Sequence, residues 1–374
     1  MKIALVSPYD FSFPGGVTNH ISSLEQHLRL MGHYVKVIGP ASQVVPSLDG
    51  SFIPIGKPRP VPASGSICRV TISPWLSPKI KETLNREKFD IIHLHEPLMP
   101  MLCTTILRLS DTVNIGTFHA HAGSPGYDFG RPLSTILLRR WFHRLNGHIA
   151  VSKPAQQFAS KYFPEDYTII PNGVDLAHFS PNVKPISQFI DDKLNILFVG
   201  RMEKRKGLNY LLKAYHQVKE EIPNCRLIVV GPGTRLRHKY EKTVAREGIK
   251  DVFFIGKVSH DDLPRYYQTA DVFCAPATSQ ESFGIILLEA MALGKPIIAS
   301  NIEGYASVLT QGKEGLLTPP RDAKGIAKAL MTLLTDQTMR RQMGEKGRVT
   351  AAKYDWQYVA QRVCDYYQKV IREV

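Results

Sequence analysis

The chain has 374 residues, of which 43% are hydrophobic and 21% charged, a balance typical of a folded protein rather than a disordered one. Its formal net charge of +14 indicates an anionic partner, and nucleic acid is disfavoured because no zinc-finger, basic-zipper or RNP motif is found. Five scattered cysteines without a C-x-x-C pair disfavour disulfides and a zinc–thiolate site.

Short runs rich in Val and Ile alternate with helical patterns along the chain, which is typical of parallel sheets covered on both faces. Each half of the chain holds enough strands for one doubly wound domain. The expected strands are residues 2–8, 34–40, 90–97, 114–120, 148–153 and 167–175, then residues 195–201, 226–233, 252–258, 272–278 and 296–301.

The domain boundary is expected between residues 172 and 193, where periodicity lapses and Pro, Asn and Asp accumulate. Residues 1–188 then form the first domain and residues 189–354 the second. Residues 355–374 carry apolar side chains at helical spacing, so we expect a helix that packs back on the first domain. Ligands of doubly wound sheets bind beyond the carboxyl ends of the strands, so two such domains can share one cleft.

Pro14, Gly15 and Gly16 lie between the first strand and the first helix. Glycines allow another group to approach the backbone, and the free N–H groups of a helix start suit phosphate. The turn lacks the G-x-G-x-x-G spacing, and no acidic residue is placed for an adenosine ribose, which disfavours a Rossmann oxidoreductase. A plain tight turn is the alternative interpretation.

Histidines stand at the ends of two expected strands. Thr117 and His119 share one strand face, so His119 falls where a doubly wound sheet binds its ligand. His93 and His95 also share a face, and such a pair can bind a metal, but the sequence shows no third ligand and we expect no metal site. A solvated or core histidine is the alternative interpretation for each.

Arg201, Arg205 and Lys206 lie where the strand at residues 195–201 meets a helix. Fixed cations at such a junction suit a diphosphate and stabilise it as it leaves with added negative charge. A solvated basic loop is the alternative.

Two glutamates flank the start of a very apolar helix. From Gly284 to Leu293 every residue is apolar except Glu289, so the helix is expected to be buried and Glu289 to need a partner. That partner is either an arginine or the two hydroxyls of a ribose. Glu281 precedes the helix start, where phosphate binds well, and it either caps the helix or contacts a sugar hydroxyl.

The Glu281 and Glu289 pair around Ser-Phe-Gly resembles the paired-glutamate motif of the retaining nucleotide-sugar glycosyltransferases of family 4. The resemblance extends over nearly the whole chain and is strongest to the bacterial phosphatidylinositol mannosyltransferases. The segments that carry it, in family order, are PGGVTNHISSLEQHLRLMGHYVKVI, DIIHLHEP, GTFHAH, IPNGVD, GRMEKRKG and CAPATSQESFGIILLEAMALGKPIIAS.

The resemblance implies a GT-B fold, an α/β architecture of two facing Rossmann-like domains, and a hexosyl transfer with retention that needs no cofactor and no metal. By matching position, catalytic roles fall on His119, Arg201, Lys206 and Glu281, with Arg201 and Lys206 on the diphosphate and Glu281 on the donor sugar. Glu289 would hold the ribose. Further donor contacts are implied at Gly15, Gly16, Ser282, Phe283, Gly284 and Ile285.

The donor favoured by the resemblance is GDP-mannose. After the turn at Val258, however, His260 stands where these enzymes carry the carboxylate that reads guanine. Asp261 follows it and can take its place through a small loop shift, so Val258 and Asp261 are the donor contacts expected here. A UDP sugar is therefore the alternative donor. For the acceptor, a lipid or other glycan, the resemblance implies contacts at Tyr9, Asp10 and Arg69, as well as at His119; an ordinary surface arginine is the alternative at Arg69.

No apolar run is long enough to cross a bilayer, and we expect a cytoplasmic protein held on the inner face of the cell membrane. Two basic amphipathic stretches, residues 77–88 and 135–145, suit an anionic membrane surface. Burial against the first domain is the alternative for the second stretch. The expected membrane contacts are Lys79, Lys81, Arg139, Arg140 and Trp141.

The sequence thus predicts a membrane-surface glycosyltransferase that moves mannose to a phosphatidylinositol-like lipid. A UDP-sugar-dependent transferase of cell-envelope glycan or glycolipid synthesis is the first alternative. A nucleotide-sugar epimerase, which would act without an acceptor, and a non-catalytic lipid or nucleic-acid binder are alternatives of other classes.

Overall fold

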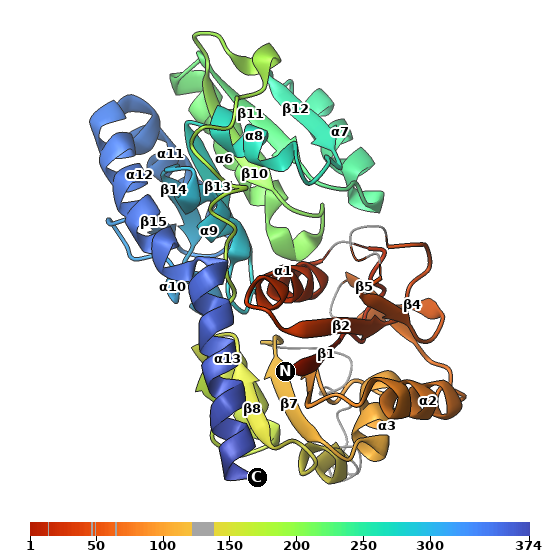
Figure 1. Ribbon diagram of the computed structural model, residues 1–374. Helices are drawn as coiled ribbons and strands as arrows, with labels where there is room; N and C mark the ends of the chain where they lie inside the picture. The colour runs from red at the N-terminus through yellow and green to blue at the C-terminus, as the bar shows by residue number, and fades with distance from the viewer. Residues whose placement is uncertain (14, 46–47, 49, 64–65, 122–137) are drawn as a thin grey trace. The chain divides into compact units, whose positions relative to one another are not determined.

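The computed structural model describes residues 1–13, 15–45, 48, 50–63, 66–121 and 138–374 (Figure 1). These residues divide into two compact units. Unit 1 comprises residues 1–173 and 356–374, and unit 2 comprises residues 174–355. Among the helices described, none combines the length and the apolar character that a membrane span requires.

The sheet of unit 1 is parallel throughout, with the strand order β3-β2-β1-β6-β7-β8-β9. Its order reverses between the neighbours β1 and β6, which is the position where doubly wound sheets bind ligands. All strands expected in the first half are present, and β3 is an addition. The strands are β1 (Lys2–Val6), β2 (Tyr34–Gly39), β3 (Phe52–Pro54), β6 (Ile91–His95), β7 (Val113–Phe118), β8 (Gly147–Ala150) and β9 (Thr168–Ile169).

A separate antiparallel hairpin, β4 (Pro58–Ala63) with β5 (Ser66–Thr71), was not expected from the sequence. Strand β4 was missed because it has prolines at positions 58, 60 and 62. Proline has no backbone N–H to donate to a neighbouring strand, so its presence argues against a strand. In a two-stranded ribbon those positions are tolerated, since each strand has a free edge.

The helices of unit 1 cover both faces of its sheet. Side chains such as Ile3 and Leu5 pack with α1 and α13, while Ala4 and Val6 face the side of α2, α3 and α5. This alternation explains why the strands read as nearly continuous apolar runs. The helices are α1 (Gly16–Leu30), α2 (Ser77–Glu87), α3 (Leu102–Leu109), α5 (Lys153–Tyr162) and α13 (Trp356–Glu373).

Unit 2 also contains a parallel sheet, which has six strands in the order β12-β11-β10-β13-β14-β15. Its order reverses between β10 and β13. The strands are β10 (Leu194–Val199), β11 (Cys225–Val230), β12 (Val252–Gly256), β13 (Val272–Ala275), β14 (Ile297–Ser300) and β15 (Gly315–Thr318), of which β15 was not expected.

The helices of unit 2 also pack on both faces of the sheet. Helices α8 and α9 pack with the strand side chains on one face of the sheet. Helices α6, α7, α11 and α12 pack with the strand side chains on the other face. Their bounds are α6 (Leu208–Glu221), α7 (Arg235–Arg246), α8 (Leu263–Thr269), α9 (Ile285–Ala292), α10 (Glu303–Ala306), α11 (Ala323–Thr335) and α12 (Gln337–Ala351).

The chain passes from unit 1 to unit 2 between residues 173 and 174, whereas the sequence predicts this boundary between residues 188 and 189. Val174 and Phe179 are buried in the core of unit 2, so the irregular segment after residue 173 already belongs to that unit. Composition located the irregular stretch correctly, but burial of its few apolar side chains decides which unit it joins. The second crossing lies at Asp355 and Trp356, one residue after the expected position.

The expected return of the terminal helix to the first domain is confirmed. Helix α13 runs beside α1, as Figure 1 shows in blue and red, and its apolar stripe enters the core of unit 1. The buried residues of the stripe are Trp356, Val359, Ala360, Val363, Cys364, Tyr367 and Val370.

Candidate active site

In unit 2 the candidate site lies at the carboxyl ends of the neighbouring strands β10 and β13. The two loops that follow these strands are joined, because the Thr278 N–H donates to the Arg205 carbonyl over 2.7 Å. Gly207 has a φ of +73°, and a side chain there would overlap the Pro276 carbonyl. The basic loop is therefore fixed against the loop that leads to α9.

Glu281 and four other charged side chains in these loops form one connected network. The Glu281 carboxylate accepts from Arg205 Nη1 at 2.6 Å and from Lys206 Nζ at 2.7 Å. Glu203 joins Arg205 at 3.0 Å and Arg201 at 3.3 Å. Arg201 is the outermost member, with 46% of its side chain exposed.

The network has a surplus of positive charge, since three cations face two carboxylates. Burial alone would raise the pKa of Glu281, but the adjacent Lys206 and Arg205 outweigh it and hold the pKa below its ordinary value. Glu281 is therefore an anion whose function includes positioning two cations. The contacts of its carboxylate are to Arg205 and Lys206, and the N-cap of α9 is Gly284.

Helix α9 begins without a side-chain cap at Gly284, which has a φ of +100°. An added Cβ at Gly284 would lie 2.7 Å from the Tyr305 ring. The first-turn amides of such a helix lack intrahelical acceptors and suit an anion. Phe283 is buried, and Ser282 and Ile285 are half-buried. Ser282 directly follows Glu281 of the charged network in the chain.

Glu289 lies on α9 as the sequence predicts, in a helix whose other residues are apolar. Its carboxylate accepts a hydrogen bond from the Tyr267 hydroxyl at 2.7 Å. Among the described residues no arginine forms an ion pair with Glu289, and the ribose contact stays a prediction. Burial raises the pKa of Glu289 to about 7, although the Tyr267 hydrogen bond and Lys206 act in the opposite direction.

At the expected base site the structure shows a histidine pair. The rings of His178 and His260 stack with centroids 4.0 Å apart, and His178 Nε2 lies 3.1 Å from the His260 carbonyl. Val258 packs against the core of unit 2, and Asp261 is exposed. His178 was not predicted, because it comes from the irregular segment before β10.

In unit 1 the expected acceptor residues are brought together by backbone pairing. Tyr9 forms an isolated bridge with Val70, and the Asp10 N–H donates to the Arg69 carbonyl over 2.8 Å. The Arg69 guanidinium lies 4.0 Å from the centre of the Phe13 ring. Asp10 is buried, with Oδ1 accepting from two loop amides.

Gly15 and Gly16 are both exposed, and Gly15 is the N-cap of α1. Neither has a positive φ, and within the described residues an added Cβ would meet nothing closer than the Thr18 hydroxyl at 3.7 Å. Unit 1 itself therefore gives no packing reason for the glycine pair. Pro14 lies outside the described residues.

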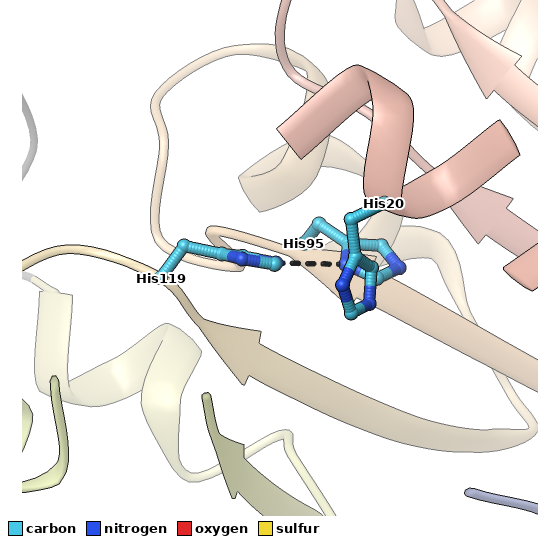
Figure 2. A group of neighbouring side chains, drawn as sticks. All are labelled: His20, His95 and His119. Carbon is cyan, nitrogen blue, oxygen red and sulfur yellow. Dashed lines mark hydrogen bonds between the residues drawn. The ribbon is translucent and has the colours of Figure 1, made fainter. Parts of the chain in front are cut away.

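His119 follows β7 and is part of a cluster of buried histidines (Figure 2). Its Nε2 lies 3.0 Å from His95 Nδ1, and its ring meets His20 edge-on with centroids 4.9 Å apart. Its backbone N–H donates to Glu96 Oε1 at 2.9 Å. Burial, with His20 and His93 nearby, lowers the pKa of His119 well below its usual range, so the ring is neutral near pH 7.

The histidine cluster contains three residues whose ring nitrogens are placed as metal ligands could be, namely His20, His95 and His119. His93 is not among them. Its Nδ1 lies 2.7 Å from the Tyr367 hydroxyl and its Nε2 lies 2.6 Å from the Thr117 hydroxyl, so both nitrogens have structural partners.

The two basic stretches differ in exposure. In α2, Lys79 and Lys81 are exposed, and Trp75 just before the helix is 86% exposed. In the second stretch Arg139 and Arg140 are exposed, but its apolar residues Leu138, Trp141 and Phe142 pack in or against the core of unit 1. Burial is therefore the correct interpretation of its apolar face; residues 135–137 lie outside the described ranges.

Sequence reasoning placed no role on several residues that contact the site. Arg205 was considered only as one of three cations for a diphosphate, and its position as the residue that connects Glu203 to Glu281 was not predicted. Tyr267 and Tyr305 come from helices that carry no motif, and His20 lies on the buried face of α1. His20 shares that face with two other polar residues, Thr18 and Glu25, so its position there gave no distinct signal.

Two family models match the chain. The one described as Glycosyltransferase Family 4 covers residues 14–178, and the one described as Glycosyl transferases group 1 covers residues 180–350. The phosphatidyl-myo-inositol mannosyltransferase of Mycobacterium leprae is 33% identical, covering 99% of this chain and 97% of that protein. The enzyme of the same description from Propionibacterium freudenreichii is also 33% identical, with 98% and 94% covered.

Solved structures share the fold at low identity. Anabaena Alr3699/HepE in complex with UDP has a TM-score of 0.80 at 18% identity, over 99% of this chain and 100% of that one. Sucrose-phosphate synthase from Thermosynechococcus elongatus has a TM-score of 0.77 at 22% identity, over the full length of both chains. Together with the family models and the relatives above, these matches show that the protein is a glycosyltransferase of the GT-B fold and belongs to family 4.

Proposed function

We propose that this glycosyltransferase transfers mannose from GDP-mannose to a hydroxyl of a phosphatidylinositol-like lipid, with retention at the anomeric carbon. The lipid and the sugar are suggested by the relatives' description as phosphatidyl-myo-inositol mannosyltransferases. The observation that carries the catalytic part is the network in which Arg205 and Lys206 hold Glu281 at the start of α9.

In this proposal unit 2 binds the donor. Arg201 and Lys206 neutralise the diphosphate, whose remaining contacts are Ser282 and the amides of Phe283, Gly284 and Ile285 at the uncapped helix start. Glu281 accepts from a sugar hydroxyl, and Glu289 accepts from the ribose in place of Tyr267. Val258 and Asp261 contact the base.

Unit 1 binds the acceptor. Arg69 pairs with the lipid phosphodiester, Tyr9 and Asp10 contact the headgroup, and His119 faces the reacting sugar. Asp10 Oδ2 is buried and has no hydrogen-bond partner in the described part of the chain, which supports a ligand contact. The exposed pair Gly15 and Gly16 at the start of α1 is a further proposed phosphate contact, although the Gly15 N–H already donates to Thr18 Oγ1 over 2.9 Å.

The chemistry needs no side-chain base. The bond between the sugar carbon and the diphosphate oxygen breaks as the acceptor oxygen bonds to the same face of that carbon. The acceptor's proton passes to the departing phosphate oxygen. We propose that no metal is required, because the cations of the network and the helix start supply the charge that stabilises the leaving group.

The protein is proposed to work at the inner face of the cell membrane. Trp75 is 86% exposed beside the exposed Lys79 and Lys81 of α2, a combination that suits an anionic lipid surface. Arg139 and Arg140 add charge to the same unit. Trp141 packs against the core and contributes less.

A UDP sugar is the second candidate donor. The stacked His178 and His260 pair replaces a carboxylate at the expected guanine-reading position, which favours a different base contact. Related structures contain UDP, as the Anabaena protein does.

A thermal-shift experiment with GDP-mannose and UDP-glucose tests the donor. A ligand that binds only the folded protein at 100 times its Kd stabilises it by about 2.7 kcal/mol. GDP-mannose is expected to raise the Tm of the wild type and of Lys204→Ala, whose side chain is exposed in the same turn, but not that of Lys206→Ala. Stabilisation by UDP-glucose alone would overturn the choice of donor.

Transfer is measured with labelled GDP-mannose and vesicles with or without phosphatidylinositol. We expect labelled lipid only with phosphatidylinositol and a loss of about 100- to 1000-fold in Lys206→Ala relative to Lys204→Ala. Labelled lipid without phosphatidylinositol would refute the acceptor. Conversion of the donor without any acceptor would instead indicate an epimerase.

A further inference from the structure

Three buried histidines from three separate elements converge beside the strand-order reversal of unit 1. His20 lies in α1, His95 is the last residue of β6, and His119 directly follows β7 (Figure 2). Their ligand-forming nitrogens all lie within 4.8 Å of one another. Strand β6 pairs with β1 and β7, and α1 is the first helix after β1, so the topology itself brings the three together.

We propose that His20, His95 and His119 form a binding site for a zinc-like divalent transition metal, and that a metal bound there inhibits transfer. Imidazole nitrogens are preferred ligands of zinc, cobalt, nickel and copper. Three protein ligands with one open position is a common zinc arrangement. The inhibition rests on the proposed function of His119, whereas the binding does not.

The distances suit such an ion after a small adjustment. In a tetrahedral zinc site with Zn–N bonds of about 2.0–2.1 Å, neighbouring nitrogens lie about 3.3 Å apart. His95 Nδ1 and His119 Nε2 are 3.0 Å apart, so a metal can replace the proton that they now share. The three nitrogens lie within 4.8 Å of one another, so the His20 nitrogen would have to approach the other two by no more than about 1.5 Å, which a side-chain rotation can provide.

The second nitrogen of His20 is also suitably placed. His20 Nδ1 lies 2.8 Å from Asn172 Oδ1, an acceptor, so Nδ1 carries the proton and Nε2 is left as the ligand. Metal-binding histidines usually donate their other N–H in this way. His95 Nε2 is buried without a hydrogen-bond partner in the described part of the chain, so the pair with His119 is the ring's one polar contact there.

Charge and protonation favour the same conclusion. In the pair His95 Nδ1 and His119 Nε2, one nitrogen donates its proton to the other, so one of the two is already an unprotonated ligand. Metal binding to both nitrogens requires that one proton move to the other nitrogen of its own ring, in either His95 or His119. The Glu96 carboxylate, which accepts from the His119 backbone, offsets part of the ion's charge.

The site has a clear consequence for transfer. His119 is the proposed contact to the reacting sugar, and a metal on its Nε2 would hold the ring against His95 and withdraw it from the substrate. The metal is therefore an inhibitor in this proposal and no cofactor, which agrees with a reaction that needs none.

The experiment titrates metal-free full-length protein with Co²⁺, followed by displacement with Zn²⁺. We expect visible d–d absorption from one Co²⁺ per chain and its loss on addition of one Zn²⁺. His20→Gln and His95→Gln should weaken Zn²⁺ binding by about 10- to 100-fold or more. The matched control is His178→Gln, which alters the other close histidine pair and should bind as the wild type does.

Inhibition is scored for each variant against its own metal-free rate. Micromolar Zn²⁺ should inhibit the wild type and His178→Gln, with reversal by EDTA, and should have less effect on His20→Gln. Circular dichroism checks folding, and His20→Gln keeps the test open if His95→Gln does not fold. Absence of Co²⁺ binding, or equal affinity in His20→Gln, would overturn the site; binding without inhibition would instead contradict the role of His119.

Discussion

At the scale of single residues, the two glutamates of the proposed donor site show how different surroundings give one side-chain type two protonation behaviours. Glu281 has Lys206 and Arg205 within 2.7 Å and stays ionised despite its burial. Among the described residues, the side-chain partner of Glu289 at that distance is the Tyr267 hydroxyl, and burial dominates the pKa of Glu289. The first is suited to holding cations and the second to exchanging a neutral partner for a ribose.

The raised pKa of Glu289 predicts a pH-dependent stability of the ligand-free protein. The folded-state pKa is about 7, above the ordinary 4.5, so between these values the folded state binds a proton that the unfolded state has released. This contribution to stability is complete below pH 4.5 and is lost as the pH rises through 7.

The Glu289→Gln variant lacks this titration and serves as the reference. From pH 5 to pH 8 the Tm of the wild type should fall relative to that of Glu289→Gln, as measured by differential scanning fluorimetry without nucleotide. Parallel Tm curves would show that Glu289 is already ionised at pH 5.

At the scale of elements, α9 depends on a backbone conformation that only its N-cap glycine accepts readily. Gly284 has a φ of +100°, and Tyr305 leaves no room for a Cβ. The same glycine exposes the first-turn amides of the helix to the proposed phosphate. Packing and ligand binding thus require one residue type at this position.

Gly284→Ala is therefore expected to be destabilising by more than the cost of the φ angle alone. Gly312→Ala isolates that cost, about 1–2 kcal/mol, because Gly312 has a φ of +74° and open space around it. The difference between the two variants in urea denaturation measures the clash with Tyr305. Equal losses would mean that Tyr305 moves aside freely.

At the scale of the whole molecule, the chain leaves unit 1 at Gly173 and returns to it at Trp356. Gly173 and Trp356 touch, since a Cβ on Gly173 would lie 2.6 Å from the Trp356 ring. Trp356 also packs on His20, with ring centroids 4.9 Å apart. The last helix is thus a structural part of unit 1, including the surroundings of its histidine cluster.

Trp356→Ala should destabilise unit 1 selectively. Trp356 is 3% exposed, and truncation of a buried tryptophan costs about 3–5 kcal/mol. Trp75→Ala, at a residue 86% exposed, should change stability by no more than about 0.5 kcal/mol. Hydrogen exchange should become faster in β1 and β6 of Trp356→Ala and stay unchanged in β10 and β13. Equal acceleration in both sheets would show that the units unfold together.

Much of the architecture could be predicted from the sequence, because buried parallel strands and amphipathic helices leave local patterns. The strands of both large sheets were found except β3 and β15, which are short, and the separate ribbon was missed because β4 is rich in proline. The boundary was placed late, since Val174 and Phe179 join unit 2 through contacts with distant residues. No local pattern records such contacts.

By itself, the sequence determined the fold class through its hydrophobic periodicity. It determined the family and the motif residues through residue types at characteristic spacings. Only the tertiary structure decided which of those residues meet. It joined Glu281 to Arg205 and Lys206, Glu289 to Tyr267, and His20 to the histidines at the ends of β6 and β7. These partners are far apart in the chain, and their proximity follows from strand order, which brings loops together at the carboxyl edge of each sheet.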